Sequence, residues 1–480
     1  MDSKKRSIVI ALMVAMFLGA VEGTVVTTAI PTIVKDLNSF ELINLVFSTY
    51  LLTSAISTPI YGKLSDLYGR NNVLCVGIII FLIGSFLCGL SGNIYELIAF
   101  RGLQGLGAGS IFTITYTIVG DIFELSERGK IQGAISSVWG IASLIGPFLG
   151  GFLIDSLSWH WIFFINIPFG ILSIVLLQKN LKEPLMKQKR KIDYLGTFIL
   201  TSSIMLLLYG ILSIQQNINY IFTMISFAVT ALLLVVFYFI EKKAEEPIVP
   251  FDIFSKTNIV VNIISFLCSA TLIGADIYLT IYLQNVLGFS PTIAGLSMAP
   301  MSISWIIAST ILGKKLTKFG EKKLTIFSTL LLLIGFSLLL VLNTHSPLLL
   351  VIIYSFILGA GFGGNFTILT ILIQEATSPN KRGAATASNS LVRTLAQAIS
   401  AGIFGLFFNS SIISYFNNLG IKHIDTNNLF SLVSTNSQVS IDTFKMSINY
   451  GLHVVFIVIL IISIICFVLA FSLSNILKGK

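Results

Sequence analysis

The chain has 480 residues, 55% of them hydrophobic and only 11% charged, and its mean hydropathy is +0.92. Soluble globular proteins carry about 25% charged residues, so this composition excludes that class. The net charge of +9 would suggest nucleic acid in a soluble protein. Here the basic residues lie between apolar segments, and no nucleic-acid partner is expected.

The predicted elements are apolar segments of about twenty residues, each long enough to cross a hydrocarbon layer of about 30 Å as a helix. A membrane β-barrel would show shorter, alternating strands instead. The first segment follows basic residues as a signal peptide does, but it is too long and lacks a small-residue cleavage site, so we expect it to be retained. In chain order, the predicted spans are residues 8–30, 42–62, 73–92, 94–119, 131–154, 161–178, 194–214, 220–240, 258–286, 291–313, 324–343, 347–373, 383–409 and 449–473.

The sequence therefore predicts an all-α polytopic membrane protein with fourteen spans. The distribution of basic residues predicts its orientation. With both termini in the cytoplasm, the inner segments hold 25 of the 30 lysines and arginines and the outer segments hold three, while Arg101 and Arg393 fall inside spans. Cytoplasmic segments are enriched in Lys and Arg, so we expect cytoplasmic N- and C-termini.

Short matches between the two ends of the chain indicate an internal repeat. "LGAG" occurs at 106–109 and at 358–361, "GKLSDLYGRNNVL" from Gly62 is echoed by "GKKLTKFGEKKLT" from Gly313, and an Arg-Gly pair occurs at 128 and at 382. The offsets of 251–254 residues place each pair at the same point of a six-span unit. We therefore predict an N-terminal six-helix bundle (1–180), two inserted spans with their loops (181–256), and a C-terminal six-helix bundle (257–480) with a long extracellular segment at 410–447. Two such halves with a site between them are typical of secondary transporters.

Several stretches resemble the motifs of one family. "GKLSDLYGR" (62–70) is similar to the signature loop of the major facilitator superfamily, "RGLQGLGAG" (101–109) to its span-four motif, and "LIGPFLGG" (144–151) to the span-five motif of its antiporters. "WHWIFFINIPFG" (159–170) and "VEGTVVTTAIP" (21–31) resemble the fourteen-span drug:proton antiporter branch, with Glu22 where that branch usually has aspartate. The chain resembles the Gram-positive multidrug exporters of that branch over essentially its whole length.

This resemblance implies the major facilitator fold and a proton-coupled multidrug exporter of the cell membrane that works by alternating access. Its partners would be lipophilic, often cationic drugs, protons and the lipid bilayer, and it would act as a monomer without a cofactor, driven by the proton gradient. An exporter dedicated to a metabolite, peptide or lipid precursor, a non-transporting membrane sensor, and sodium coupling stay open. An enzyme is least supported, since the sequence has no P-loop, no H-E-x-x-H motif and no soluble domain. The four cysteines lie inside spans and the four histidines are dispersed, so no metal site is expected.

The loop motif supplies a candidate conformational latch. Gly62 and Gly69 are expected to permit tight turns. Asp66 can pair with Arg70 or face a helix N-terminus, and Asp121, at the inner end of span four, is a second partner for Arg70. The resemblance implies that this cluster latches the two halves in one conformation. The alternative is an ordinary ion pair worth about 0–1 kcal/mol.

The second-half copy of the loop and the glycines of span five also bear on how the two halves could open and close. The second-half copy has Thr317 and Glu321 in place of the acid and the arginine, so we expect its latch to be degenerate. In span five, the antiporter motif removes side chains from one face and interrupts one backbone hydrogen bond, which permits close approach and bending at an interface that opens and closes. Tight packing without motion is the alternative. The motif residues are Gly146, Pro147, Gly150 and Gly151.

The remaining candidates are charges inside spans. A charge near the bilayer centre costs about 2.5–3.5 kcal/mol on insertion scales, so it should face a cavity or a partner. Glu22 in span one and Asp276 in span nine occupy related positions, and we expect them to serve proton coupling, cation binding or both. A structural salt bridge from Glu22 to Arg101 is the alternative, compatible with the first. Glu375 is an inner-gate or substrate-path candidate or an interfacial charge, and Arg393 has no assigned role.

Overall fold

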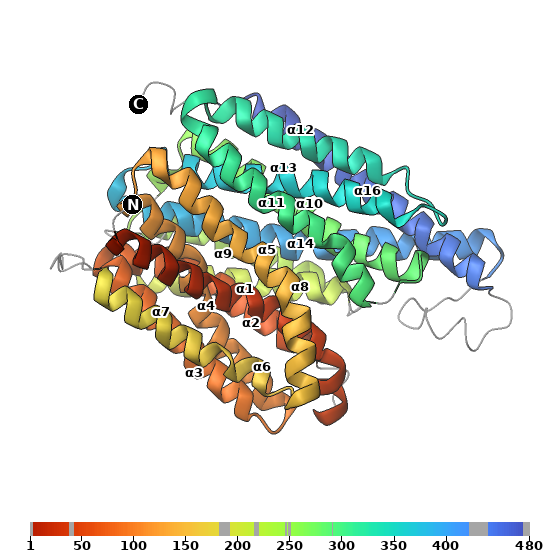
Figure 1. Cartoon of the computed structure of the whole chain (residues 1–480), viewed down its shortest axis with the longest axis horizontal. Helices are drawn as coiled ribbons and strands as arrows, with labels where there is room; N and C mark the ends of the chain where they lie inside the picture. The colour runs from red at the N-terminus through yellow and green to blue at the C-terminus, as the bar shows by residue number, and fades with distance from the viewer. Residues whose placement is uncertain are drawn as a thin grey trace.

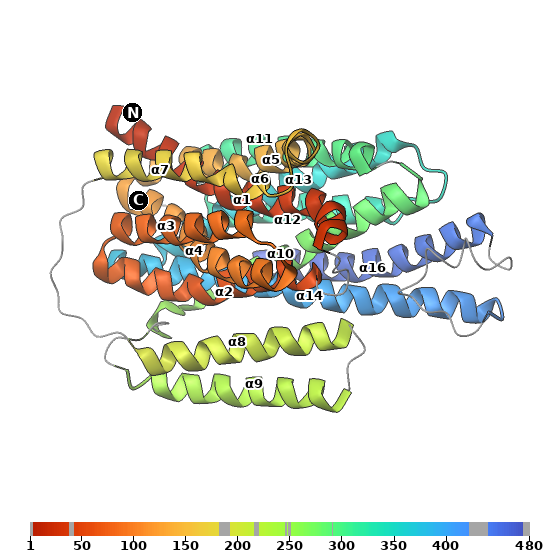
Figure 2. The same ribbon diagram turned by 90° about the horizontal axis from the view of Figure 1, so that it is seen from below.

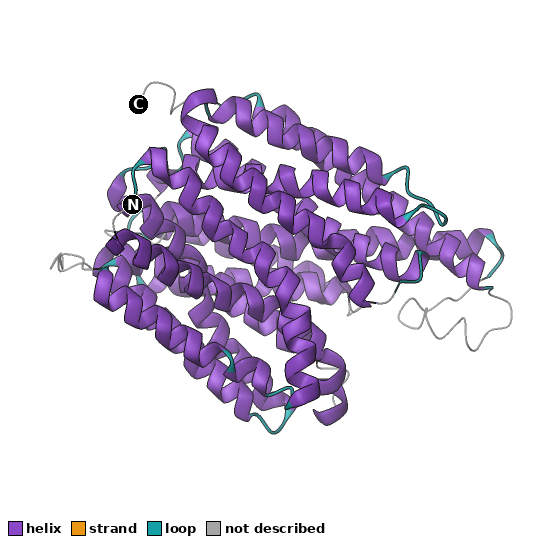
Figure 3. Ribbon diagram, in the orientation of Figure 1, coloured by secondary structure: helices purple, strands orange, loops and turns teal. Residues whose placement is uncertain are grey.

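The computed structural model describes residues 3–37, 43–181, 193–215, 220–244, 247, 251–289, 291–421 and 440–473. In these ranges the regular secondary structure is helical (Figure 3). The first group of helices is α1 (Ser3–Leu37), α2 (Ile43–Tyr68), α3 (Arg70–Leu90), α4 (Ile94–Ile122), α5 (Leu125–Ser156), α6 (Trp161–Phe164) and α7 (Asn166–Asn180). The next pair is α8 (Tyr194–Gln215) and α9 (Tyr220–Glu241).

The rest of the described chain forms a second group of helices. A short 3-10 turn, η1 (Phe251–Ile253), precedes α10 (Lys256–Ile281), which ends in the π-helical turn η2 (Tyr282–Val286). The following elements are α11 (Pro291–Phe319), α12 (Glu321–Leu339), α13 (Leu348–Glu375), η3 (Pro379–Lys381), α14 (Arg382–Asn418) and α16 (Ile441–Ala470). The predicted spans lie on helices to within a few residues, with 161–178 divided between α6 and α7. Eleven helices of the described chain are long and apolar enough to cross a membrane.

The two groups pack as separate bundles (Figure 1), which we call the first half (α1–α7) and the second half (α10–α16). Two buried apolar clusters lie within the first half, and a third lies mainly in the second half and includes residues of α2, α8 and α9. The halves meet mainly along two helix pairs, α2 with α14 and α5 with α11, and α4 and α5 also contact α14 and α13. Helices α8 and α9 pack on each other outside the bundle, beside α2 and α14 (Figure 2). Helix α1 begins and α16 ends at the same end of the molecule, which we call the inner end.

The repeated glycines of the loop motif show which local conformations the sequence requires. Gly69 joins α2 to α3 with a φ of 90°, and Gly320 joins α11 to α12 with a φ of 78°. Residues that carry a side chain rarely adopt this positive φ, so glycine is needed at both turns. The turn expected at Gly62 is wrong, because this residue lies inside α2. Because Gly62 has no side chain, α2 can lie close to α14 of the second half.

The outer ends of α14 and α16 extend beyond the predicted spans. α14 continues to Asn418 and α16 begins at Ile441, where Ser440 accepts a hydrogen bond from the backbone N–H of Thr443 at 3.1 Å. This side-chain cap satisfies a free N–H of the first turn. Helices therefore occupy both ends of the predicted extracellular segment 410–447, and its middle, 422–439, lies outside the described residues.

Candidate functional site

The predicted latch residues meet at the inner end of the first half. Arg70 pairs with Asp66 one turn earlier in the chain, and its Nε donates to Asp121 Oδ2 of α4 at 3.0 Å. The backbone N–H of Ala384, in the first turn of α14, donates to Asp66 Oδ2 at 3.1 Å. An acid at this point also interacts favourably with the helix dipole. The cluster therefore joins the first half to a helix N-terminus of the second half.

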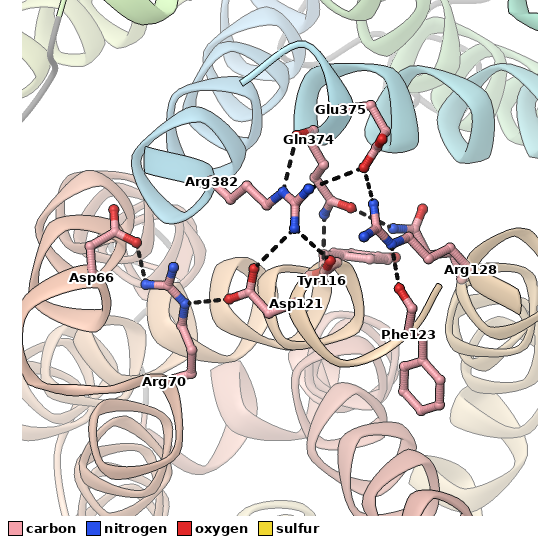
Figure 4. Close-up of polar contacts among 11 residues, drawn as sticks. Asp66, Arg70, Tyr116, Asp121, Phe123, Arg128, Gln374, Glu375 and Arg382 are labelled. Carbon is pink, nitrogen blue, oxygen red and sulfur yellow. Dashed lines mark hydrogen bonds and ion pairs between the residues drawn. The ribbon is translucent and has the colours of Figure 1, made fainter. Parts of the chain in front are cut away.

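A second set of contacts at this end crosses between the halves (Figure 4). Arg128 of α5 pairs with Glu375 of α13, and Arg382 of α14 lies 3.6 Å from Asp121 of α4. Arg382 also donates to Glu375 at 3.2 Å and to the carbonyl of Gly120 at 3.0 Å. The two arginines occupy related positions in the repeat, and so do the two acids. Each half therefore gives its arginine to the acid of the other half, a crosswise arrangement.

Glycines let the helices approach each other beneath this network. A Cβ at Gly129 would overlap the carbonyl group of Gly313, and a Cβ at Gly62 would overlap the Cβ of Ala387. Such distances leave no room for a side chain on α5 against α11 or on α2 against α14. Gly133 and Gly140 continue the α5–α11 contact against Thr310 and Ser302. The sequence analysis identified Gly129 only as part of the repeated Arg-Gly pair and did not single out Gly133 or Gly140.

The span-five motif faces a different partner. Gly146 packs on Thr24 of α1, whose Oγ1 donates to the carbonyl of Ala142 at 3.2 Å. This contact lies within the first half, whereas the α5 residues that meet the second half lie nearer the helix start. Pro147 and Gly151 lie inside α5, which continues to Ser156.

Deep in the first half, Glu22 and Arg101 form a buried pair. Arg101 Nη1 lies 2.5 Å from Glu22 Oε1, and each side chain is only 1% exposed. Asn166 of α7 donates to the other Glu22 oxygen at 2.8 Å. Gln104 accepts from Arg101 Nη1 at 2.6 Å, and the Tyr50 ring lies 4.1 Å from the guanidinium carbon. Side chains from α2, α4 and α7 thus surround the acid of α1.

Asp276 occupies the related position of α10 in a different environment. Its side chain is exposed while the adjacent Ala275 is buried. Thr280 donates to its backbone carbonyl at 2.7 Å, and no ion pair or hydrogen bond from the described residues reaches its carboxylate. The structure therefore does not join Asp276 to Glu22, Arg101 or Glu375.

The comparisons with known proteins agree with this architecture. The Major Facilitator Superfamily model matches residues 12–401. Multidrug resistance protein 3 of Bacillus subtilis (strain 168) is 36% identical over 407 residues, which are 84% of this chain and 80% of that protein. Multidrug efflux pump SdrM of Staphylococcus aureus (strain N315) is 33% identical over 402 residues, covering 83% of this chain and 89% of the relative.

Two solved structures share the fold. The human organic anion transporter MFSD10 (TETRAN) superposes with a TM-score of 0.68, covering 98% of this chain and 100% of that one. The proton:xylose symporter XylE has a TM-score of 0.65, with 99% and 96% covered. Both are 15% identical to this chain, so this likeness bears on the fold alone.

Proposed function

The chain belongs to the major facilitator superfamily and is a multi-pass membrane transporter rather than an enzyme, and from this premise we propose that it is a drug:proton antiporter. It would export lipophilic, often cationic molecules by alternating access. All fourteen spans would cross the membrane, with both termini in the cytoplasm. The positive-inside count supports this orientation, and the multidrug relatives support the cargo.

The buried carboxylate of Glu22 is the observation that carries the proposal of proton coupling. A charged side chain inside the bilayer is costly, so it is usually paired with another group. In transporters such residues commonly lie on proton paths. Ionised Glu22 satisfies the guanidinium of Arg101 and the amide of Asn166. A protonated Glu22 would leave that buried guanidinium without its counter-charge, so the surrounding helices would repack. Proton binding would thus bias the first half toward a second arrangement.

Helix α5 would transmit this change to the interface between the halves. Thr24, two residues after Glu22, packs on Gly146 of α5. Six residues earlier, about 9 Å along the helix, Gly140 begins the contact with α11 of the second half. A shift of α1 at the acid therefore acts on a rigid element that also contacts the opposite half, as coupling between two sites requires.

The inner-end network would hold the conformation that is closed toward the cytoplasm. Asp66, Arg70 and Asp121 join α14 to the first half, and the crosswise arginines contribute two further ion pairs across the interface. These contacts must all separate for the inner side to open. Binding of a proton or a drug would change the balance between the two states by its difference in affinity for them.

Proton flux linked to drug addition tests the proposal. The protein is reconstituted in liposomes with an internal pH dye, and a lipophilic cation, ethidium, is added to the wild type and to Glu22→Gln. We expect ethidium to move protons in the wild type and the flux to be lost in the variant, since glutamine keeps the hydrogen-bonding shape but cannot ionise.

The matched control is Glu96→Gln, which makes the same change at an exposed position in the first turn of α4. It should retain the wild-type flux. A wild type that moves no protons with any drug would contradict proton antiport and favour sodium coupling or a dedicated cargo, and repeating the assay with a sodium gradient separates those two. Unchanged flux in Glu22→Gln would remove Glu22 from the coupling path.

A further inference from the structure

Arg393 differs from the other buried or half-buried arginines of the described chain. Arg70, Arg101, Arg128 and Arg382 each lie within ion-pair distance of a carboxylate. Arg393 donates from Nη2 to the hydroxyl of Thr370 at 3.0 Å, and the described residues give it no acidic partner. Its Nε–H is buried without a hydrogen-bond acceptor among them. A cation in the membrane interior is costly when unpaired, so this one needs an explanation.

Its position is on the route between the two halves. Arg393 lies eleven residues beyond Arg382 in α14, a rise of about 16 Å from the inner-end network. That distance is about half of a hydrocarbon layer of ~30 Å. Tyr116 of α4, from the first half, and Cys268 of α10 are the titratable groups that interact electrostatically with the guanidinium. The side chain is partly exposed.

An aromatic stack lies directly beside the guanidinium. The Arg393 guanidinium carbon is 4.7 Å from the ring centre of Phe366. Phe366 stacks on Trp305 of α11 at 5.3 Å and 20°, and on Phe362 at 6.2 Å and 15°. The Trp305 indole N–H is also buried and has no acceptor among the described residues. A free cationic donor therefore adjoins a stacked aromatic surface and a second free donor.

We propose that Arg393 is an anion-recognition residue on the substrate path, which selects planar aromatic molecules that carry a carboxylate or a sulfonate, zwitterions included. Arginine presents several N–H donors in a planar fork that matches these groups, and one of them is already unsatisfied. The anion would neutralise the guanidinium while the aromatic part contacts the rings. This proposal rests on the proposed export function and extends its cargo beyond cations.

A pair of dyes that differ in one charge tests the proposal. Rhodamine B carries a free benzoate and is a zwitterion, whereas its ethyl ester has the same ring system and is a cation. Binding of each dye to purified protein is measured by fluorescence polarisation for the wild type, Arg393→Gln and Arg393→Lys. We expect Arg393→Gln to weaken binding of rhodamine B by about tenfold or more and of the ester by less than about threefold, because only the acid loses a charge-assisted hydrogen bond.

The second variant and a control keep the outcome interpretable. Arg393→Lys retains the charge but not the fork, so its loss for the acid should be intermediate. Arg6→Gln removes an arginine charge from an exposed position at the start of α1 and should change neither affinity. An equal loss for both dyes in Arg393→Gln would make Arg393 a structural residue. No loss for the acid, or no binding of the acid by the wild type, would overturn the proposal.

The binding assay needs no transport, so it separates this proposal from the export function. Arg393-dependent binding of rhodamine B without dye-linked proton flux in liposomes would refute antiport while the anion site stands. Proton flux with ethidium, together with equal effects of Arg393→Gln on both dyes, would leave antiport standing and refute the anion site.

Discussion

The two halves hold their embedded charges in opposite ways. In the first half, Glu22 and Arg101 lie 2.5 Å apart and are both buried. In the second half, Asp276 and Arg393 are separated. Gly274, two residues before Asp276, packs against Phe404 of α14, and Phe404 lies eleven residues, or about 16 Å along the helix, from Arg393. Neither Asp276 nor Arg393 has an ion-pair partner among the described residues.

This difference indicates a division of work. A pair that satisfies itself changes only when a small ion such as a proton reaches it, whereas separate charges of both signs are available to a larger molecule. At the inner end the halves are alike instead, since each supplies one arginine and one acid to the crosswise network.

The largest effect should come from unpairing the buried acid. Arg101→Met leaves the carboxyl of Glu22 buried without its partner, which costs about 3–5 kcal/mol. Arg393→Met leaves no carboxylate behind, so we expect it to cost less than about 1 kcal/mol, the scale of the one hydrogen bond it loses. Chemical denaturation in detergent measures both. The double variant Glu22→Gln with Arg101→Met should recover much of the loss, and equal costs for the two single variants would contradict the contrast between the halves.

A smaller and symmetric effect is expected at the inner end. Arg128→Met and Arg382→Met each remove one arm of the crosswise network, and each should raise the fraction open toward the cytoplasm by about fivefold to a hundredfold. The alkylation rate of a cysteine introduced at Thr310, which packs against Gly133 across the interface, reports that fraction. Lys130→Met, at an exposed neighbouring position, is the control. A response from only one arginine would show that the halves are not equivalent here.

Sequence alone predicted much of the fold because hydrophobic length and basic residues carry that information locally. The predicted spans lie on helices to within a few residues, except that 161–178 is divided between α6 and α7. The pairing of Arg70 with Asp66 and Asp121 followed from a motif whose members are close in the chain or share a helix end. The Glu22–Arg101 pair followed from equal depth in two spans. Depth along a helix is readable from sequence, so contacts that depend on depth alone were predictable.

Contacts that depend on how the halves dock were not predictable in this way. The repeat placed Arg128 and Arg382 at equivalent points, but nothing local says that each pairs with the acid of the opposite half. Gly62 was assigned to a turn because the motif contains two glycines, yet only Gly69 has a positive φ. The sequence could not distinguish an inner-gate role for Glu375 from a charge at the membrane interface, since both positions lie at the same depth. The partners of these residues lie between 247 and 325 positions away in the chain.

The smallest effect concerns the second-half acid, and it tests whether separated charges select cargo. Asp276→Asn removes an exposed carboxylate that has no ion-pair or hydrogen-bond partner among the described residues, so the free energy of unfolding should change little. Binding of ethidium should weaken by about tenfold, the value of one charge-assisted contact, while a neutral drug should change by less than about threefold. Fluorescence binding assays on purified protein measure both, with Asp442→Asn, an exposed acid at the start of α16, as the control. Loss of drug-linked proton flux with both drugs would instead make Asp276 a second proton carrier, and the two halves would then share the coupling that we assign to the first.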